Sequence, residues 1–381
     1  MNGNRKIEDA QHRAWMEVDL AGLRRNYARV AKAVRPASVL CVVKAGAYGL
    51  GAEAFARTLA KCGAAAFGVA TPEEAMEVKS LGLGLPVQIL SAVMPEEIAP
   101  MVEAGVTLPV ADLAAAKRIS AAARKLKTKA RVHFKLDTGM GRLGILAADA
   151  PRVIRAAWRL PNLDCEGIFS HCPVASDPAD PFTKEQFARF RNVLADVARD
   201  GIKFRVVHVA ASDAINFFPQ AARRPFNRVR AGLDLHGCVN DAGIRALGLE
   251  QIFTFKARIA QVRRLPTGTT IGYGRTFRVA KPARIATLAA GYADGIPLAL
   301  SNRGRVLVRG VPCPVVGRIS MDYTTVDVSH VPGRVDMGDA VTLLGRDGGE
   351  AIPAAEWGDL KGTHPHDILT SISPRVVRIA R

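Results

Sequence analysis

Short apolar segments alternate with helix-like segments eight times between residues 38 and 237 of this 381-residue chain. The strand-like segments are rich in β-branched residues, and apolar residues recur every three or four positions in most segments between them. The predicted strands cover residues 38–44, 66–70, 86–90, 106–110, 130–136, 163–171, 205–211 and 227–237. Eight strands alternating with helices predict a (β/α)8 TIM-type barrel, with a doubly wound open sheet as the second candidate.

The sequence pattern changes after residue 245. Residues 246–381 contain few helix-like segments and many short strand-like ones, separated by Gly and Pro, which is typical of a mainly antiparallel β domain. We therefore expect an α/β chain with a barrel over residues 1–245 and a C-terminal mainly β domain over residues 246–381. A strand-like segment within residues 12–20 is a candidate member of either domain, including a pairing with the C-terminal one.

The chain is strongly basic, with 53 Lys and Arg against 35 Asp and Glu and a formal net charge of +18. Such a balance favours anionic ligands, and nucleic acid is one candidate partner. The basic residues are spread along the sequence, however, and no basic tail, aromatic-rich strand pair or zinc finger accompanies them. We therefore expect no nucleic-acid partner.

Hydropathy and cysteine spacing indicate the cellular compartment in which the protein is expected. No apolar run approaches the ~18–20 residues of a membrane-spanning helix, and residues 1–15 are polar and mixed in charge, unlike a signal peptide. The cysteines show neither CxxC nor zinc-site spacing; they are Cys41, Cys62, Cys165, Cys172, Cys238 and Cys313. These features predict a cytoplasmic protein with reduced thiols, no membrane partner and no metal site.

Basic and imidazole side chains lie at several successive predicted strands. Lys44 ends the first strand, Lys135 lies in the fifth, His171 ends the sixth, His208 lies in the seventh and Arg230 in the eighth. The carboxyl ends of barrel strands meet at one face, where the active sites of such barrels lie. These side chains predict a site for an anionic, phosphate-bearing ligand, with one lysine available for covalent chemistry.

The segment GMGRLG at residues 139–144 matches the GxGxxG dinucleotide-binding pattern and follows a predicted strand. In that fold the helix begins inside the motif. Here the predicted helix begins later, around residues 147–158, and no dinucleotide-binding half surrounds the motif. The sequence therefore disfavours a nicotinamide cofactor.

Several glycine-rich or arginine-containing motifs occur in a fixed order along the chain. They are VVKAGAYGLG (42–51), KLDTGMGRLG (135–144), FNRVRAGLDLHG (226–237), IGYGRTF (271–277), AAGYADG (289–295) and GRISMD (317–322). With these motifs, nearly the whole chain resembles the alanine racemase family. The resemblance implies a barrel plus β domain that binds pyridoxal 5'-phosphate and interconverts L-alanine and D-alanine. It also implies a head-to-tail homodimer whose active sites are shared between subunits.

The resemblance assigns the catalytic residues. Lys44 is implied to hold the cofactor as an aldimine and to act as one base, and Tyr273 to act as the second base. His171 is the candidate hydrogen-bond partner of the Tyr273 oxygen. Arg230 is implied to face the pyridine nitrogen, with His208 orienting it. Because a guanidinium does not give up its proton, this nitrogen stays unprotonated, which favours racemisation over transamination.

The remaining implied roles are in cofactor and substrate binding. The phosphate contacts are Tyr48, Ser212 and the backbone N–H groups of Gly232 and Leu233. Arg142 is implied to contact the phenolic oxygen of the cofactor and the substrate carboxylate, and Tyr292 and Met321 to lie near the substrate. Lys135 lies beside Arg142, and two adjacent cations repel; Lys135 is therefore a candidate for a carbamate formed with CO2.

Three positions depart from the family pattern. Gly46 stands where relatives usually have Asn or Asp, Leu50 where they have His, and Pro374 where some have a phosphate-binding Tyr. These departures leave open a racemase of broader or different small amino-acid specificity, such as serine. Two further protein classes share the barrel and the cofactor. A decarboxylase needs a glycine-run phosphate motif and a catalytic cysteine in the β domain, and the sequence shows neither, although Cys313 lies in that region. A cofactor carrier would lack the β domain, so the strand-rich residues 246–381 disfavour it. Both biosynthetic supply of D-alanine and breakdown of L-alanine are compatible with the sequence.

Overall fold

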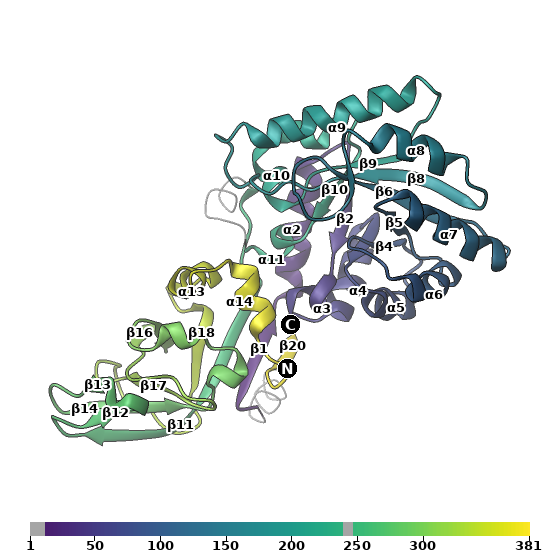
Figure 1. Cartoon of the computed structure of the whole chain (residues 1–381). Helices are drawn as coiled ribbons and strands as arrows, with labels where there is room; N and C mark the ends of the chain where they lie inside the picture. The colour runs from purple at the N-terminus through teal and green to yellow at the C-terminus, as the bar shows by residue number, and fades with distance from the viewer. Residues whose placement is uncertain (1–11, 239–246) are drawn as a thin grey trace. The chain divides into compact units, whose positions relative to one another are not determined.

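The computed structural model describes residues 12–238 and 247–381, and the chain divides into two compact units (Figure 1). The barrel unit consists of Leu23–Ala47 and the described part of Ala52–Glu250. The β unit combines the described part of Met1–Gly22 with Tyr48–Gly51 and Gln251–Arg381. The domain boundary predicted between residues 245 and 246 lies outside the described residues.

Eight parallel strands form the wall of the barrel in the described part of this unit. They are β2 (Ser38–Val42), β3 (Ala66–Val69), β4 (Val87–Ile89), β5 (Leu108–Val110), β6 (Ala130–Asp137), β8 (Leu163–Phe169), β9 (Val206–His208) and β10 (Arg228–Ala231). They pair in the order β10-β2-β3-β4 and β5-β6-β8-β9, and the two-residue β7 (Ile145–Leu146) pairs with β6 off this path. A parallel bridge between Gln88 and Thr107 joins β4 to β5, and the Arg230 N–H donates to the Ala210 carbonyl (3.0 Å) beside β9. The strands therefore close into the predicted (β/α)8 barrel.

Helices cover the outside of this barrel (Figure 1). They are α2 (Leu20–Ala33), α4 (Ala52–Cys62), α5 (Pro72–Ser80), α6 (Ile98–Glu103), α7 (Leu113–Lys125), α8 (Ala150–Trp158) and α9 (Phe182–Ala198), followed by the short α10 (Ser212–Phe217). Helix α7 illustrates the local cause: the Asp112 side chain caps the Ala115 N–H, and Ala116, Ile119 and Ala123 form its buried face. None of the described helices has both the length and the apolar character to cross a bilayer.

The eighth predicted strand is too long at its carboxyl end. β10 stops at Ala231, and residues predicted to continue it form helix α11 (Leu233–His236). Gly232 precedes this helix, and Gly237 ends it with φ 65°. The apolar run therefore contains both a buried strand and a buried helical turn, which periodicity alone does not separate.

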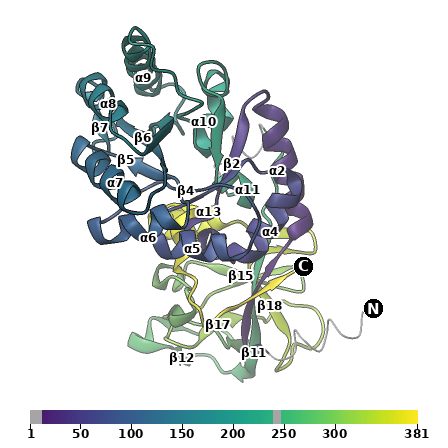
Figure 2. The ribbon, with the colours of Figure 1, turned by 90° about the vertical axis from the view of Figure 1, so that its right-hand side faces the viewer.

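The β unit is built around one large sheet (Figure 2). Its main path is β16 (Val311–Pro314), β15 (Arg305–Val308), β18 (Ala340–Asp347), β11 (Phe253–Leu265), β1 (Ala14–Val18) and β20 (Val377–Ala380). β14 (Ala283–Leu288), β17 (Thr324–Asp327) and β19 (Glu350–Ile352) pair off this path. The pairs are antiparallel except β1–β20, which is parallel.

Buried and partly exposed residues alternate along most of β11, as expected of a strand with one face on a core. Phe255 of this strand packs against Trp357 of α13 (Ala354–Lys361), with ring centroids 6.3 Å apart. The last helix, α14 (Pro365–Ser371), precedes β20. This core gives the β unit an apolar interior of its own.

Candidate active site

Lys44 begins a short left-handed turn directly after β2. Ala45, Gly46 and Ala47 have φ 51°, 61° and 53°, and Tyr48 continues with φ 55°. Non-glycine residues rarely take this conformation, which costs roughly 1–2 kcal/mol for each of them. Gly46 fits the turn without that cost. Backbone strain beside a lysine at the carboxyl end of a barrel strand marks a functional segment.

Glu74 of α5 holds this turn in place. Its Oε1 accepts the Ala45 N–H (2.6 Å), and its Oε2 accepts the Ala70 N–H (2.7 Å). The same carboxylate completes a capping box with Thr71 at the start of α5. Sequence reasoning missed this role of Glu74. Its only sequence signal is the Thr71–Glu74 spacing, which predicts a helix start and nothing about Lys44.

Four basic side chains, those of Lys44, Lys135, Arg142 and Arg230, form a cation cluster at the carboxyl ends of the strands. Burial lowers the pKa of Lys44, Arg142 and Arg230 lower it further, and Glu74 opposes them. Burial, followed by the charges of Arg230, Arg142 and Lys44, lowers the pKa of Lys135 to about 8. Both lysines therefore have a larger neutral fraction at pH 7 than ordinary lysines have.

Phe169 lies beneath two of these cations. The Lys135 Nζ is 5.2 Å from its ring centroid, and the Arg230 Cζ is 5.7 Å away. Lys135 also donates to the Leu90 carbonyl. The ring face attracts the cations, so Phe169 and the carbonyl offset part of their mutual repulsion.

The GMGRLG segment forms a loop organised by Asp137. Its Oδ1 accepts the N–H groups of Gly139 and Met140 (both 2.8 Å), and its Oδ2 accepts that of Arg142 (3.2 Å). Burial alone raises the pKa of Asp137, but these backbone donors outweigh it and lower the pKa. The loop is thus shaped to present Arg142, and no helix begins inside the motif.

Arg230 is 5% exposed and is held by several acceptors. Its Nη2 donates to the Ser170 carbonyl (2.8 Å) and lies 3.3 Å from His171 Nδ1, and its Nη1 donates to His208 Nδ1 (3.0 Å). Because a guanidinium only donates, both imidazole Nδ1 atoms accept. Burial and the charges of Arg230 and Arg142 lower the pKa of His171 to about 3. His171 is therefore neutral and carries its proton on Nε2.

Ser212 and the segment after β10 form a cradle of hydrogen-bond donors. The Ser212 Oγ accepts the N–H groups of Gly232 and Asp234 (both 3.2 Å). An oxygen that accepts two N–H groups still has its own proton to donate. Ser212 opens α10, and Leu233 opens α11, where helix N–H groups favour an anion.

Tyr273, Tyr292 and Met321 belong to the β unit. They are 72%, 42% and 52% exposed. The loop of residues 318–321 contacts the segments that carry both tyrosines. Beside Tyr273, a Cβ added at Gly272 would lie 2.9 Å from the Arg318 N. Beside Tyr292, the Ala293 N–H donates to the Met321 carbonyl (3.0 Å). Tyr48 also belongs to this unit, where Arg378 donates to the neighbouring Gly49 carbonyl (2.8 Å).

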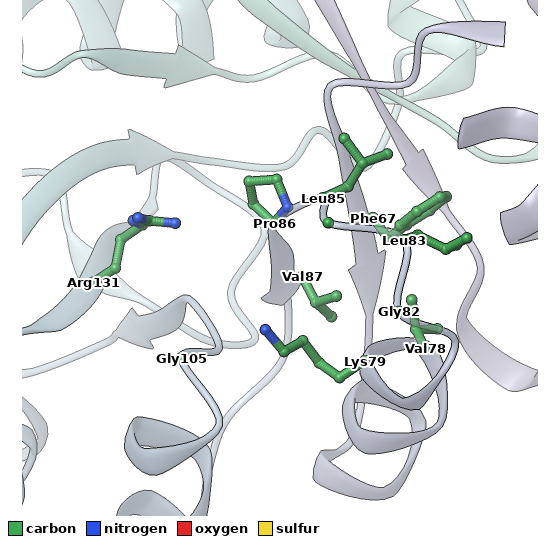
Figure 3. Close-up of a pocket in the computed structure, with 11 residues that line it drawn as sticks. Phe67, Val78, Lys79, Gly82, Leu83, Leu85, Pro86, Val87, Gly105 and Arg131 are labelled. Carbon is green, nitrogen blue, oxygen red and sulfur yellow. The ribbon is translucent and has the colours of Figure 1, made fainter. Parts of the chain in front are cut away.

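A pocket of about 600 Å³ lies at the opposite, amino-terminal ends of the barrel strands (Figure 3). Val87 begins β4, Arg131 lies at the start of β6, and Lys79 comes from the end of α5. Catalytic groups of such barrels lie at the other face. The chemistry is therefore assigned to the cation cluster at the carboxyl ends.

The donor set of the barrel unit fits pyridoxal 5'-phosphate. Ser212 and the N–H groups at the start of α11 suit its phosphate, and the Lys44 amine, whose pKa is lowered, suits an aldehyde. Arg230, buried and fixed, suits a ring nitrogen that accepts a hydrogen bond. The barrel unit thus brings together nine sequence-predicted residues: Lys44, Lys135, Arg142, His171, His208, Ser212, Arg230, Gly232 and Leu233.

Comparison with known proteins adds independent findings. Models of the alanine racemase N-terminal and C-terminal domains match residues 18–240 and 252–380. The alanine racemase of Syntrophobacter fumaroxidans is 40% identical over 362 residues, which are 94% of this chain and 95% of that protein.

Solved structures agree with the sequence relatives. Alanine racemase from D-cycloserine-producing Streptomyces lavendulae has a TM-score of 0.91 and 32% identity, covering 97% of each chain. Alanine racemase from Bartonella henselae, described with covalently bound pyridoxal phosphate, has a TM-score of 0.87 and 29% identity, covering 97% of this chain and 99% of that one. The strained lysine turn, the donor cradle and these matches together show that the chain belongs to the alanine racemase family of pyridoxal-phosphate-dependent isomerases.

Proposed function

We propose that alanine is racemised here by two bases, Lys44 and Tyr273, on opposite faces of the substrate Cα. The observation that carries this proposal is the place of Lys44 in the cation cluster, because burial there, followed by the charges of Arg142 and Arg230, lowers its pKa and makes its amine a better base near neutral pH. The bound cofactor withdraws electrons from the amino-acid Cα and so makes its proton acidic. One base removes that proton while the other delivers a proton to the opposite face.

Chain residues hold the reacting groups in place. We assign Tyr48, Ser212 and the N–H groups of Gly232 and Leu233 to the phosphate, and Arg230 to the pyridine nitrogen. Arg142 and Met321 bind the substrate carboxylate, Met321 through its backbone N–H. Because a guanidinium does not give up its proton, Arg230 would leave the nitrogen of the bound cofactor unprotonated and would favour return of the proton to the substrate Cα over transamination.

We assign the second base to the other copy in a homodimer, so that Tyr273 of the partner subunit faces Lys44. Tyr273, Tyr292 and Met321 are large apolar or aromatic side chains left exposed around one loop. Such an exposed group is typical of an interaction surface, and a two-fold arrangement completes both sites at once. His171, which carries its proton on Nε2, is the proposed donor to the oxygen of that tyrosine.

We assign the preference for a substrate with a small side chain to the same three residues, Tyr273, Tyr292 and Met321. Two tyrosine rings and a methionine crowd the space beyond Cβ, and one additional methylene in a tight site costs about 1–3 kcal/mol. We therefore expect alanine to be the best substrate and serine to be weaker. The described cysteines are free thiols, which supports a reducing, cytoplasmic location.

Exchange of the Cα proton in deuterium oxide tests the two-base assignment. The Tyr273→Phe enzyme should still exchange the Cα proton of one alanine enantiomer through Lys44 while racemisation falls by orders of magnitude. The expected product is deuterated alanine of unchanged configuration. Loss of exchange for both enantiomers, or undiminished racemisation, would contradict the assignment.

A further inference from the structure

A chain of hydrogen bonds leads from Arg230 through the barrel interior to Glu166. Arg230 Nη1 lies 3.0 Å from His208 Nδ1, His208 Nε2 lies 3.2 Å from His133 Nδ1, and His133 Nε2 lies 2.9 Å from Glu166 Oε2. The four residues come from β10, β9, β6 and β8. The two imidazoles are 0% and 1% exposed, whereas the Glu166 side chain is 19% exposed.

The end groups fix the direction of every bond in the chain. Arg230 can only donate, so His208 Nδ1 accepts and the His208 proton lies on Nε2. That N–H donates to His133 Nδ1, which places the His133 proton on Nε2. This proton is donated to Glu166, whose ionised carboxylate can only accept. Both histidines are therefore neutral Nε2–H tautomers. If every bond ran in the opposite direction, the unprotonated His133 Nε2 would face the Glu166 carboxylate, and no hydrogen bond could form there.

The surroundings keep both histidines neutral. Burial lowers the pKa of each ring, and the positive charges of Arg230 and Arg228 act on His208 in the same sense. Arg228 and Arg131 also lower the pKa of His133, while Glu166 opposes them. Phe169 stacks on His208 with centroids 5.0 Å apart and planes 7° apart, which fixes the plane of that ring.

We propose that Glu166 and His133 are positioning residues that hold His208 in the Nε2–H tautomer and thereby hold the guanidinium of Arg230 in place. Neither residue is part of the cation cluster at the carboxyl ends of the strands. Their effect on catalysis rests on the proposed role of Arg230, but their effect on the tautomers does not. A charged acceptor at the end of the chain makes the last hydrogen bond about twice as strong as a neutral one.

Replacing Glu166 with Gln removes the negative charge of this side chain while keeping its size and shape. The amide can either accept from His133 or donate to it, so a second direction of the chain becomes possible. In that direction both histidines carry the proton on Nδ1, and His208 sets an N–H against Arg230. Arg230 Nη1 must then move away from His208 Nδ1, while Nη2 keeps its bonds to the Ser170 and Val209 carbonyls.

Asp164 supplies a matched control on the same strand. It pairs with Arg205 (2.7 Å) and Arg131 (3.8 Å), which also approach Glu166 at 3.8 and 3.6 Å. Asp164→Asn therefore removes one charge from the same cluster of side chains and leaves the bond to His133 intact.

Nitrogen-15 solid-state NMR of histidine-labelled holoenzyme measures the tautomers directly, with signals assigned by His133→Gln and His208→Gln. The wild-type and Asp164→Asn enzymes should show only the Nε2–H form at both positions between pH 6 and 8. In Glu166→Gln, a clear Nδ1–H population should appear at both. An Nδ1–H or doubly protonated ring in the wild type would overturn the proposal even if the variant does not fold.

Steady-state kinetics with the same enzymes complete the test. For Glu166→Gln we expect kcat to fall about tenfold with KM changed less than about twofold, as is usual when a supporting partner of an active-site group is lost. Asp164→Asn should match the wild type. Wild-type tautomers or wild-type kcat in Glu166→Gln would each refute the positioning role. Failure of the two-base mechanism itself would appear separately, in the deuterium exchange of Tyr273→Phe.

Discussion

At the scale of single residues, burial and positive charge at the barrel mouth change the charge state of Lys135. Its pKa of about 8 makes about half of its amine neutral at pH 8 and roughly a tenth at pH 7. Only a neutral amine attacks CO2: the N–C bond forms, one proton leaves to water, and the product is an anion. A carbamate at Lys135 would replace repulsion from Arg142 and Arg230 with attraction.

We therefore predict a carbamate on Lys135. Enzyme equilibrated with carbon-13 bicarbonate should show a protein-bound carbamate signal in carbon-13 NMR, and at fixed dissolved CO2 its intensity should rise from pH 7 to pH 8.5. Lys135→Arg should lack the signal while exposed lysines such as Lys117 remain unlabelled. Equal signals in the wild-type and Lys135→Arg enzymes would disprove the modification.

Asp234 is a second residue whose pKa is shifted in the folded protein. Burial, partly opposed by hydrogen bonds from Asn216 and Ser212, raises its pKa to about 7. Its Oδ2 and the Asn216 Oδ1 are both buried without a hydrogen-bond partner. The folded state therefore favours the protonated carboxyl, whereas the unfolded chain ionises near pH 4.

This difference predicts how stability depends on pH. The unfolded state loses the Asp234 proton first, so this residue lowers the free energy of unfolding as the pH rises from about 4 to about 7. Asp234→Asn removes that loss and should be stabilised relative to wild type by about 2–4 kcal/mol more at pH 8 than at pH 4.5. Urea unfolding of the holoenzyme at both pH values measures this difference in the free energy of unfolding. Glu96→Gln, at an exposed position, is the control. A relative stability independent of pH would show that Asp234 is ionised in the fold.

At the scale of structural elements, a side chain of α5 supports the left-handed turn after β2. Residues 45–49 all have positive φ, and the three that are not glycine, Ala45, Ala47 and Tyr48, make this turn costly for an isolated chain. Hydrogen bonds from backbone N–H groups to an ionised carboxylate contribute roughly 1.5–3 kcal/mol. The bond from the Ala45 N–H to Glu74 therefore offsets a large part of the strain beside Lys44.

Removal of this carboxylate should loosen the turn while the barrel stays folded. In Glu74→Ala we expect faster hydrogen–deuterium exchange in peptides covering residues 43–50 and about tenfold lower kcat, because a displaced reacting group loses rate. Glu73 is the neighbouring carboxylate of α5 and is exposed, so Glu73→Ala should behave as wild type in both measurements. Unchanged exchange in Glu74→Ala would show that the turn is held by other contacts.

At the scale of the whole molecule, the proposed bases lie in different units of the chain, Lys44 in the barrel unit and Tyr273 in the β unit. A homodimer with shared sites makes a quantitative prediction for mixtures of Lys44→Ala and Tyr273→Phe chains. Each variant alone should be nearly inactive. In a mixed dimer one site carries both changes and the other neither, so random exchange restores about a quarter of wild-type sites.

Activity after mixing, plotted against the fraction of mixed dimers, checks this prediction. Differently tagged chains establish independently that subunits have exchanged. If both bases came from one chain, every site would still lack one base. Exchange without any recovery of activity would therefore exclude the shared site.

The sequence by itself determined the barrel, the β-rich region and the residues at the carboxyl ends of the strands. Those features depend on local patterns: alternation, helical spacing and motifs whose residues are close in the chain. The ends of the strands were predicted less well. The largest difference is at β10, which stops at Ala231, because the apolar run there fits both a strand and a buried helix.

The tertiary structure alone decided which distant residues support the site. Glu74 meets the Lys44 turn from 29 positions away, and His133 meets His208 from 75 positions away. β1 pairs with β11 and β20, whose residues follow it by more than two hundred positions. Such contacts depend on how closed strands and packed helices bring side chains together in three dimensions. The periodicity of one segment does not predict such a contact, because the local pattern of a residue is the same whichever distant partner the fold places beside it.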